Sequence, residues 1–337
     1  NRLTGSFGYF QRKTYDMVGP APELPAILGT AVPKVNNLDM TSKGWDLQIS
    51  WRDKVSDFNY GVTLNLSDNV VVIDKYPNDS KSLGSTYYKG AHLGDIWGYT
   101  TIGIAKTQAE MDEHLKKVDQ KYLGTGWGAG DIMYADLDGD GKISTGQNTA
   151  DDSGDRSIIG NTTPRYNFGL NLDGSWKGID LKIFFQGTLK RDYMPGGSMF
   201  WGACGIGKWQ MTGLVDHLDY FRDENTASAK ELGVNLDSYY PRTNWGGSRN
   251  TQTQTRYLQN AAYCRLKNIT LGYTLPISIT SKFYCQKLRV FASAENLFTI
   301  TKFTGTSDPE LVGVGEWGYG KTYPLSKTFS VGLNITF

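Results

Sequence analysis

The sequence Thr328-Phe329-Ser330-Val331-Gly332-Leu333-Asn334-Ile335-Thr336-Phe337 alternates between apolar residues and small or polar residues. Successive side chains of a β-strand point to opposite faces, so this pattern predicts a strand with one apolar and one polar face. Both the wall of a membrane barrel and an edge strand of a soluble β-sandwich carry such a pattern. Patterns elsewhere in the chain are needed to distinguish a membrane barrel from a soluble sandwich.

The same alternation recurs along the chain and predicts eight strands in all. Tyr166–Phe168–Leu170–Leu172 and Ile179–Leu181–Ile183–Phe185 flank Lys177-Gly178, which predicts a tight hairpin. The predicted strands cover residues 3–17, 37–51, 58–73, 166–176, 179–185, 257–273, 287–299 and 328–337. The predicted fold class is all-β.

Long and short connections alternate between these strands. The turns at residues 52–57, at Lys177-Gly178 and near Pro276 are short, whereas the other connections are long. The long connections are residues 18–36, 74–163, 192–256 and 301–327. Long loops on the outside and short turns on the inside are typical of transmembrane barrels. The sequence therefore predicts an antiparallel transmembrane β-barrel with extracellular loops. Within the second loop, residues 107–118 predict a short helix with acidic residues early and lysines late.

An acidic stretch, Asp136-Leu137-Asp138-Gly139-Asp140-Gly141-Lys142-Ile143-Ser144, lies inside that second loop. Alternate carboxylates in a glycine-rich turn can converge on calcium. Position twelve is Gln147 instead of the glutamate of such loops, so a distal carboxylate must come from Asp151, Asp152 or Asp155. The alternative is a turn whose side chains bond their own backbone. The candidate ligands are the side chains of Asp136, Asp138, Asp140, Ser144 and Asp155, and the carbonyl of Lys142.

Several motifs, in order, resemble SusC-type TonB-dependent outer-membrane transporters. The acidic stretch belongs to one, GDI-x-Y-x-DLDGDGKI, and residues 155–170 follow as DR-x-IIGN-x-x-P-x-Y-x-FGL. The other segments that resemble the family are Gly94-Asp95-Ile96-Trp97-Gly98-Tyr99, residues 263–273 (YCRLKNITLGY), residues 289–298 (RVFASAENLF) and Asp308-Pro309-Glu310. An alternating last strand that ends in Phe also resembles outer-membrane barrels.

The resemblance implies a function and partners for the whole transporter. It implies that residues 1–337 are the C-terminal portion of a 22-stranded barrel, whose N-terminal plug and TonB contact are absent from this chain. It also implies uptake of oligosaccharides, less often peptides, across the outer membrane of a Gram-negative bacterium, with energy from the TonB complex and a SusD-type surface lipoprotein as partner. The calcium would be structural. We expect the chain to be the tail of a longer polypeptide, because no signal peptide precedes the first strand.

Two other interpretations remain open at this stage. One is a soluble calcium-dependent carbohydrate-binding β-protein, and the other is a small structural outer-membrane barrel, since eight strands can close on their own. A net charge of +1 gives no reason to expect nucleic acid. The histidines are scattered, and the glycine-rich Gly124–Gly128 stretch lacks the strand–helix setting of a phosphate loop, so we expect no enzyme.

Aromatic side chains are frequent in the predicted outer loops. Flat rings suit stacking on sugars and anchoring of partner proteins. The alternative roles are a lipid-boundary girdle or the core of folded loops. The candidates for ligand or partner contact are Trp97, Trp127, Trp201, Trp209, Tyr239, Trp245 and Trp317.

Overall fold

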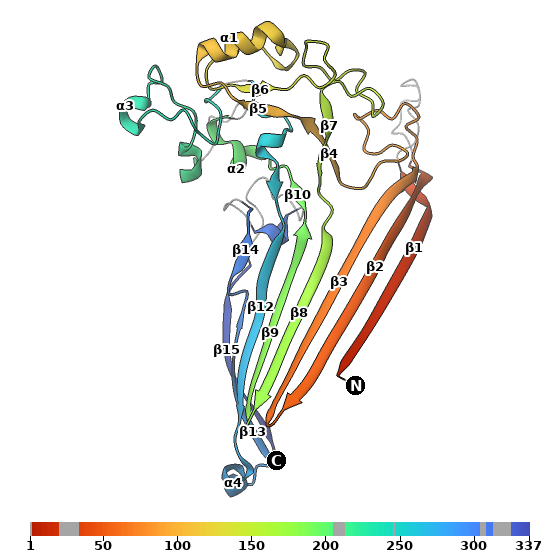
Figure 1. The fold of residues 1–337 in the computed structure, drawn as a ribbon, viewed down its shortest axis with the longest axis vertical. Helices are drawn as coiled ribbons and strands as arrows, with labels where there is room; N and C mark the ends of the chain where they lie inside the picture. Colours follow the sequence, from red (N-terminus) through yellow and green to blue (C-terminus); the bar gives the residue numbers. More distant parts are fainter. Residues whose placement is uncertain (1, 20–33, 205–212, 245–246, 304–307, 313–324) are drawn as a thin grey trace.

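The protein was analysed as a computed structural model, which describes residues 2–19, 34–204, 213–244, 247–303, 308–312 and 325–337. A single antiparallel sheet dominates it, and its long strands follow one another in chain order (Figure 1). These strands are β1 (Leu3–Gly19), β2 (Val35–Val55), β3 (Phe58–Lys75), β8 (Arg165–Trp176), β9 (Ile179–Lys190), β12 (Tyr263–Thr274), β13 (Lys287–Glu295) and β15 (Thr328–Thr336). A short strand, β14 (Thr299–Thr301), pairs with β12. All eight predicted strands are present.

Across the sheet, the register places apolar side chains in one row and polar side chains in the next, with Phe184 as an exception in the polar row. One row of paired residues is Leu3–Trp51–Val62–Leu172–Ile183–Ile269–Ala294–Phe329. The adjacent row is shifted by one residue along each strand. It is Thr4–Ser50–Thr63–Asn171–Phe184–Asn268–Glu295–Thr328. The apolar face stays exposed: Phe7 is 68%, Val331 82% and Leu333 62% accessible. A soluble sandwich buries such a face, whereas a membrane barrel presents it to lipid.

The short connections have the backbone that tight turns need. Lys177 and Gly178 have φ of 44° and 90°, the left-handed region typical of a two-residue hairpin turn. Ser56 has φ of 54° at the turn between β2 and β3. The connection near Pro276 is larger and contains α4 (Ile277–Thr280) and the 3-10 helix η6 (Ser281–Phe283). These three turns lie at the lower end of the sheet in Figure 1.

Two predicted strands are shorter than the alternation suggested. The strand expected from Tyr257 begins only at Tyr263, because residues 255–257 form a 3-10 turn and residues 259–260 pair with another strand. The strand expected over residues 287–299 stops at Glu295. Asn296 then takes a left-handed conformation with φ of 53°, which interrupts the ladder before β14.

Residues 76–164 (loop A) and residues 191–262 (loop B) carry their own small elements at the upper end of the sheet (Figure 1). Helix α1 (Gln108–Lys117) confirms the helix predicted over residues 107–118, with Thr107 as the N-cap. Loop A holds β4 (Asp95–Tyr99), β5 (Thr101–Ile104), α1, η2 (Lys121–Leu123), β6 (Ile132–Tyr134) and β7 (Arg156–Asn161). Loop B holds β10 (Asp192–Tyr193), α2 (Gly197–Trp201), η3 (Gly202–Cys204), η4 (Val215–Leu218), α3 (Ala229–Leu232), η5 (Thr255–Tyr257) and β11 (Gln259–Asn260).

The largest hydrophobic core of the described residues lies in these loops and not in the sheet. Loop A contributes Tyr99, Ile104, Ala105, Met111, Trp127, Ile132, Met133, Tyr134 and Ile143, and loop B contributes Phe200, Trp201, Cys204, Phe221, Tyr240 and Tyr257. None of the helices in the described part of the chain is both long and apolar enough to cross a membrane.

Candidate functional site

The acidic stretch folds as a tight turn directly after β6. Asp136 accepts hydrogen bonds from the backbone N–H groups of Gly139 (2.7 Å) and Gly141 (2.8 Å). These two glycines have φ of 79° and 78°, a conformation that L-residues rarely adopt. Burial works to raise the pKa of Asp136, but hydrogen bonds from the backbone of Gly141, Gly139 and Asp140 and from the Asp138 side chain outweigh it, so its pKa lies below the ordinary value. Asp136 is therefore held as an anion.

Of the three candidates for the distal carboxylate, Asp155 is the one whose side chain lies near those of Asp136 and Asp138. Its side chain is fully buried and accepts from the N–H groups of Leu137 and Ser144, each at 2.7 Å. Carboxylate oxygens of Asp136, Asp138 and Asp155 all lie within 4.8 Å of one another. Burial raises the pKa of Asp155, the two N–H donors lower it, and the charges of Asp138 and Asp136 raise it further, with a raised pKa as the net result.

Three converging carboxylates, one of them buried, fit a hard divalent cation, which prefers oxygen ligands and would offset their mutual repulsion. The other candidate ligands lie differently. Asp140 accepts from the N–H of Lys142 at 2.8 Å, and the Ser144 hydroxyl accepts from the N–H of Gly146 at 3.1 Å. Lys142 lies opposite Asp119 in an isolated parallel bridge, whose hydrogen bonds are made by the carbonyl of Gly141 and the N–H of Ile143. Of the four candidate carboxylates, all within the described residues, the structure brings together three, those of Asp136, Asp138 and Asp155.

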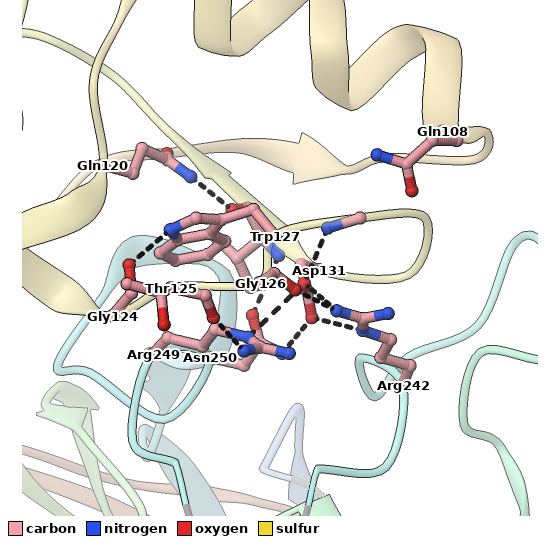
Figure 2. A network of polar contacts seen from close by, with 12 residues as sticks. Gln108, Gln120, Gly124, Thr125, Gly126, Trp127, Asp131, Arg242, Arg249 and Asn250 are labelled. Atoms are coloured by element: carbon pink, nitrogen blue, oxygen red, sulfur yellow. Dashed lines mark hydrogen bonds and ion pairs between the residues drawn. The ribbon is translucent and has the colours of Figure 1, made fainter.

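A second cluster, which the sequence analysis missed, is centred on Asp131, one residue before β6 (Figure 2). The Asp131 side chain is fully buried and receives Arg242 through two hydrogen bonds, Nε to Oδ1 at 2.8 Å and Nη2 to Oδ2 at 2.6 Å. Asn250 Nδ2 donates to Oδ1 at 2.8 Å, and the N–H of Gly128 donates to Oδ2 at 2.9 Å. Arg249 adds a second ion pair to Asp131, with its Nε 3.4 Å from Oδ2.

The glycine-rich residues 124–128 surround the two guanidinium groups of this cluster. Arg249 donates to the carbonyl of Thr125 at 2.5 Å, and Arg242 donates to the carbonyl of Gly126 at 2.7 Å. The Arg249 guanidinium also lies 5.7 Å from the centre of the Trp127 ring. This stretch therefore serves as a guanidinium-binding turn. Arg242 and Arg249 lie more than a hundred residues further along the chain, so the spacing of residues within a short motif could not have indicated the cluster.

The aromatic candidates that the structure describes lie within the folded loops. Trp127 and Trp201 are 9% and 6% accessible, and both belong to the loop core. Tyr239 is half-buried against Phe200 and Tyr257, and Trp97 is half-buried in β4. Trp209, Trp245 and Trp317 lie outside the described residues. The placement of the first four gives them a packing role, and contact with a ligand stays a prediction for the whole set.

The polar face of the sheet is hollowed. One cavity of about 600 Å³ lies over β2, β3, β8, β9 and β12, and a larger one of about 1340 Å³ lies towards the short turns. The first is bordered by the amide side chains of Gln48, Asn65, Asn167 and Gln186, and by Arg191 and Glu310. Amide groups both donate and accept hydrogen bonds, and Asp46, Arg191 and Glu310 add charges of both signs, so this wall suits a polar surface.

A short segment from the last long connection is fixed onto this polar face. Arg265 is 3% accessible, and its guanidinium contacts the carboxylates of Asp308 and Glu310, each at 2.6 Å. Lys267 adds a second cation to Glu310 at 3.0 Å. Arg191 donates to the carbonyl of Val312 at 2.7 Å and to that of Thr162 at 3.0 Å. Residues 308–312 are thus held against the inner wall by cations from β12 and from the end of β9.

Comparison with known proteins gives consistent relatives. The chain is 28% identical over 374 residues to the TonB-dependent receptor P3 of Formosa agariphila, covering 100% of this chain and 32% of the relative. It is 24% identical over 355 residues to the TonB-dependent receptor P26 of the same organism, covering 33% of it. It is 23% identical over 354 residues to the TonB-dependent receptor SusC of Bacteroides thetaiotaomicron, covering 30% of it. The chain therefore spans about a third of the length of these relatives. No protein-family model matches it.

Solved structures show the same fold. The RagAB peptide transporter superposes with a TM-score of 0.69 at 24% identity, covering 100% of this chain and 34% of that one. The RagAB peptide importer in its open-open state gives the same TM-score, with 33% of that chain covered. The sheet described above therefore has the fold of part of a β-barrel, which confirms the predicted fold class. The resemblance carried by the motifs is also confirmed: over its whole length, the chain matches TonB-dependent receptors of the SusC type.

Proposed function

We propose that this chain is part of a transporter that imports polar oligomers, oligosaccharides or peptides, across the outer membrane of a Gram-negative bacterium. The observation that carries the proposal is the two-faced sheet, with an apolar face exposed at Val331 and Leu333 and a hollowed polar face behind it. Such a wall needs lipid on one side and a hydrated lumen on the other. Loops A and B, at the end opposite the short turns, then face the cell exterior.

The remaining strands, the plug and the TonB contact would come from the part of the transporter outside this chain. In the part of the chain that the structure describes, the sheet leaves one edge of β1 and one edge of β15 unpaired, and unpaired backbone groups are costly in lipid. A SusD-type surface lipoprotein on the outer loops is the proposed partner. RagAB is described as a peptide importer, which supports peptides as one substrate class. The SusC-type resemblance supports oligosaccharides as the other.

We also propose that calcium occupies the site formed by Asp136, Asp138 and Asp155 and has a structural role. The buried Asp155 carboxylate beside two further carboxylates supports this role. Ile143, between these ligands in sequence, is fully buried in the loop core. The ion would therefore fix the acidic turn against that core.

The test of the transport proposal is extraction from native outer membranes in mild detergent, followed by intact mass measurement of everything that co-purifies. We expect a plug-bearing polypeptide or fragment together with a lipoprotein. Uptake of labelled peptides and of labelled oligosaccharides by cells with and without the gene then distinguishes the two substrate classes. A chain that stays in solution without detergent would contradict the proposal and favour the calcium-dependent binding protein. A lone membrane species of 37.4 kDa would favour the small structural barrel.

A further inference from the structure

Loops A and B share one hydrophobic core, although β8 and β9 separate them in the sequence. Phe200 and Trp201 of loop B are 5% and 6% accessible, and they pack in the same cluster as Met111, Ile132 and Tyr134 of loop A. Burial raises the pKa of Tyr134 well above its ordinary value, so its hydroxyl stays neutral and donates to the carbonyl of Arg249 at 2.6 Å. Buried side chains of both loops therefore belong to one core cluster.

Backbone hydrogen bonds also cross between the loops. The N–H of Tyr99 donates to the carbonyl of Thr253 at 2.8 Å, and the N–H of Arg242 donates to that of Gly130 at 2.8 Å. The N–H of Ile132 donates to the Asn250 side chain at 3.0 Å. Loop B thus supplies hydrogen-bond partners to Tyr99 at the end of β4, and to Gly130 and Ile132 around the start of β6.

Loop A also depends on loop B for the counterions of its buried Asp131. A fully buried carboxylate is costly unless cations and donors surround it. Both cations, Arg242 and Arg249, come from loop B, as does Asn250. Separation of the loops would leave Asp131 without its counterions and would release both guanidinium groups from residues 125 and 126.

We propose that loops A and B form one cooperative unit, here called the head, which opens and moves as a single body and is held together by Asp131. The head reaches the barrel through adjacent stems: β4 pairs with β7, β10 pairs with β11, and the N–H of Asn161 donates to Asp192 at 3.1 Å between them. A partner or ion that orders one loop therefore orders the other. This inference does not depend on which substrate is carried.

The test is hydrogen exchange, followed by mass spectrometry, of the complete transporter in detergent, with Asp131→Asn compared to the unaltered protein. We expect amide exchange to accelerate by at least about tenfold in both loops, over residues 97–104 and 130–134 of loop A and residues 238–256 of loop B. Strands β3, β8 and β9 should be unchanged. The matched control is Lys106→Gln, which removes an exposed ion pair with Asp237 that also crosses between the loops. It should change exchange by less than about twofold.

Faster exchange confined to one loop in Asp131→Asn would overturn the proposal. A second measurement serves if the variant fails to reach the membrane. In the unaltered protein, exchange at increasing urea concentration should give the same midpoint for peptides of loop A and loop B. Separate midpoints would show that the loops open independently, and this outcome says nothing against transport itself.

Discussion

Asp131 and Arg242 form a two-point ion pair, with distances of 2.8 and 2.6 Å, across 111 residues of sequence. The pair joins two connections that a barrel topology alone would leave as separate loops. Its placement beside β6 also puts it close in sequence to the acidic turn that begins at Asp136. Residues 132–135 therefore connect the Asp131 cluster of the head directly to the proposed calcium site.

Replacement of Asp138 with Ala is expected to loosen the outer loops without affecting the barrel strands. The side chain is one of three converging carboxylates, so its loss should weaken calcium binding by at least about tenfold. Chelator treatment of the unaltered protein should have the same effect, measured as faster proteolysis within residues 74–163. Asp112→Ala, on the exposed surface of α1, is the control. Unchanged protease sensitivity after chelation would contradict the calcium site.

Cys204 should act as a reporter of head opening. Burial raises the pKa of its thiol to about 12 from an ordinary value of 9.0, and the thiol donates to the carbonyl of Pro241. Since the thiolate is the reactive form, alkylation at pH 8 should be at least about tenfold slower at Cys204 than at Cys285. The raised pKa favours the folded head fully below pH 9, and this contribution is lost as the pH rises towards 12. Alkylation that levels off near pH 9 would mean that the thiol is not buried.

The motifs and the alternation were enough to predict the sheet, because strand period and turn residues are local properties. Lys177-Gly178 marks its hairpin, and all eight strands were found. Strand ends were less predictable: the apolar Leu297 and Phe298 follow Asn296 in the sequence, yet the left-handed backbone of Asn296 ends β13. The spacing of its aspartates was enough to predict the acidic turn. The spacing could not decide which of Asp151, Asp152 and Asp155 supplies the distal carboxylate. The ion-pair cluster at Asp131 could not be predicted from the sequence, because its cations, Arg242 and Arg249, come from another loop.

Arg265→Gln is expected to release residues 308–312 from the inner wall. Among the described residues, Lys267 is then the remaining cation in an ion pair with this segment, and removal of one partner from a buried ionic cluster costs about 3–5 kcal/mol. The measurement is proteolysis between residues 301 and 327 in the complete transporter, which should become faster while the strands stay protected. Lys267→Gln, which removes the more exposed cation, should have a smaller effect. Equal effects of the two variants would place the main anchor elsewhere.

The last prediction concerns the orientation of the sheet in the membrane. Val331 is 82% accessible and pairs with Ala292 on the apolar face, whereas its neighbour Ser330 pairs with Ser293 on the polar face. Val331→Lys would place a cation in lipid, at a cost of about 2–4 kcal/mol near the midplane, while Ser330→Lys would place it in the hydrated lumen. We expect the first variant to lower the amount of folded transporter in the outer membrane, measured by heat-modifiable migration on gels, and the second to leave it unchanged. The reverse order would mean that the polar face is the one that meets lipid, and the barrel assignment of both faces would fail.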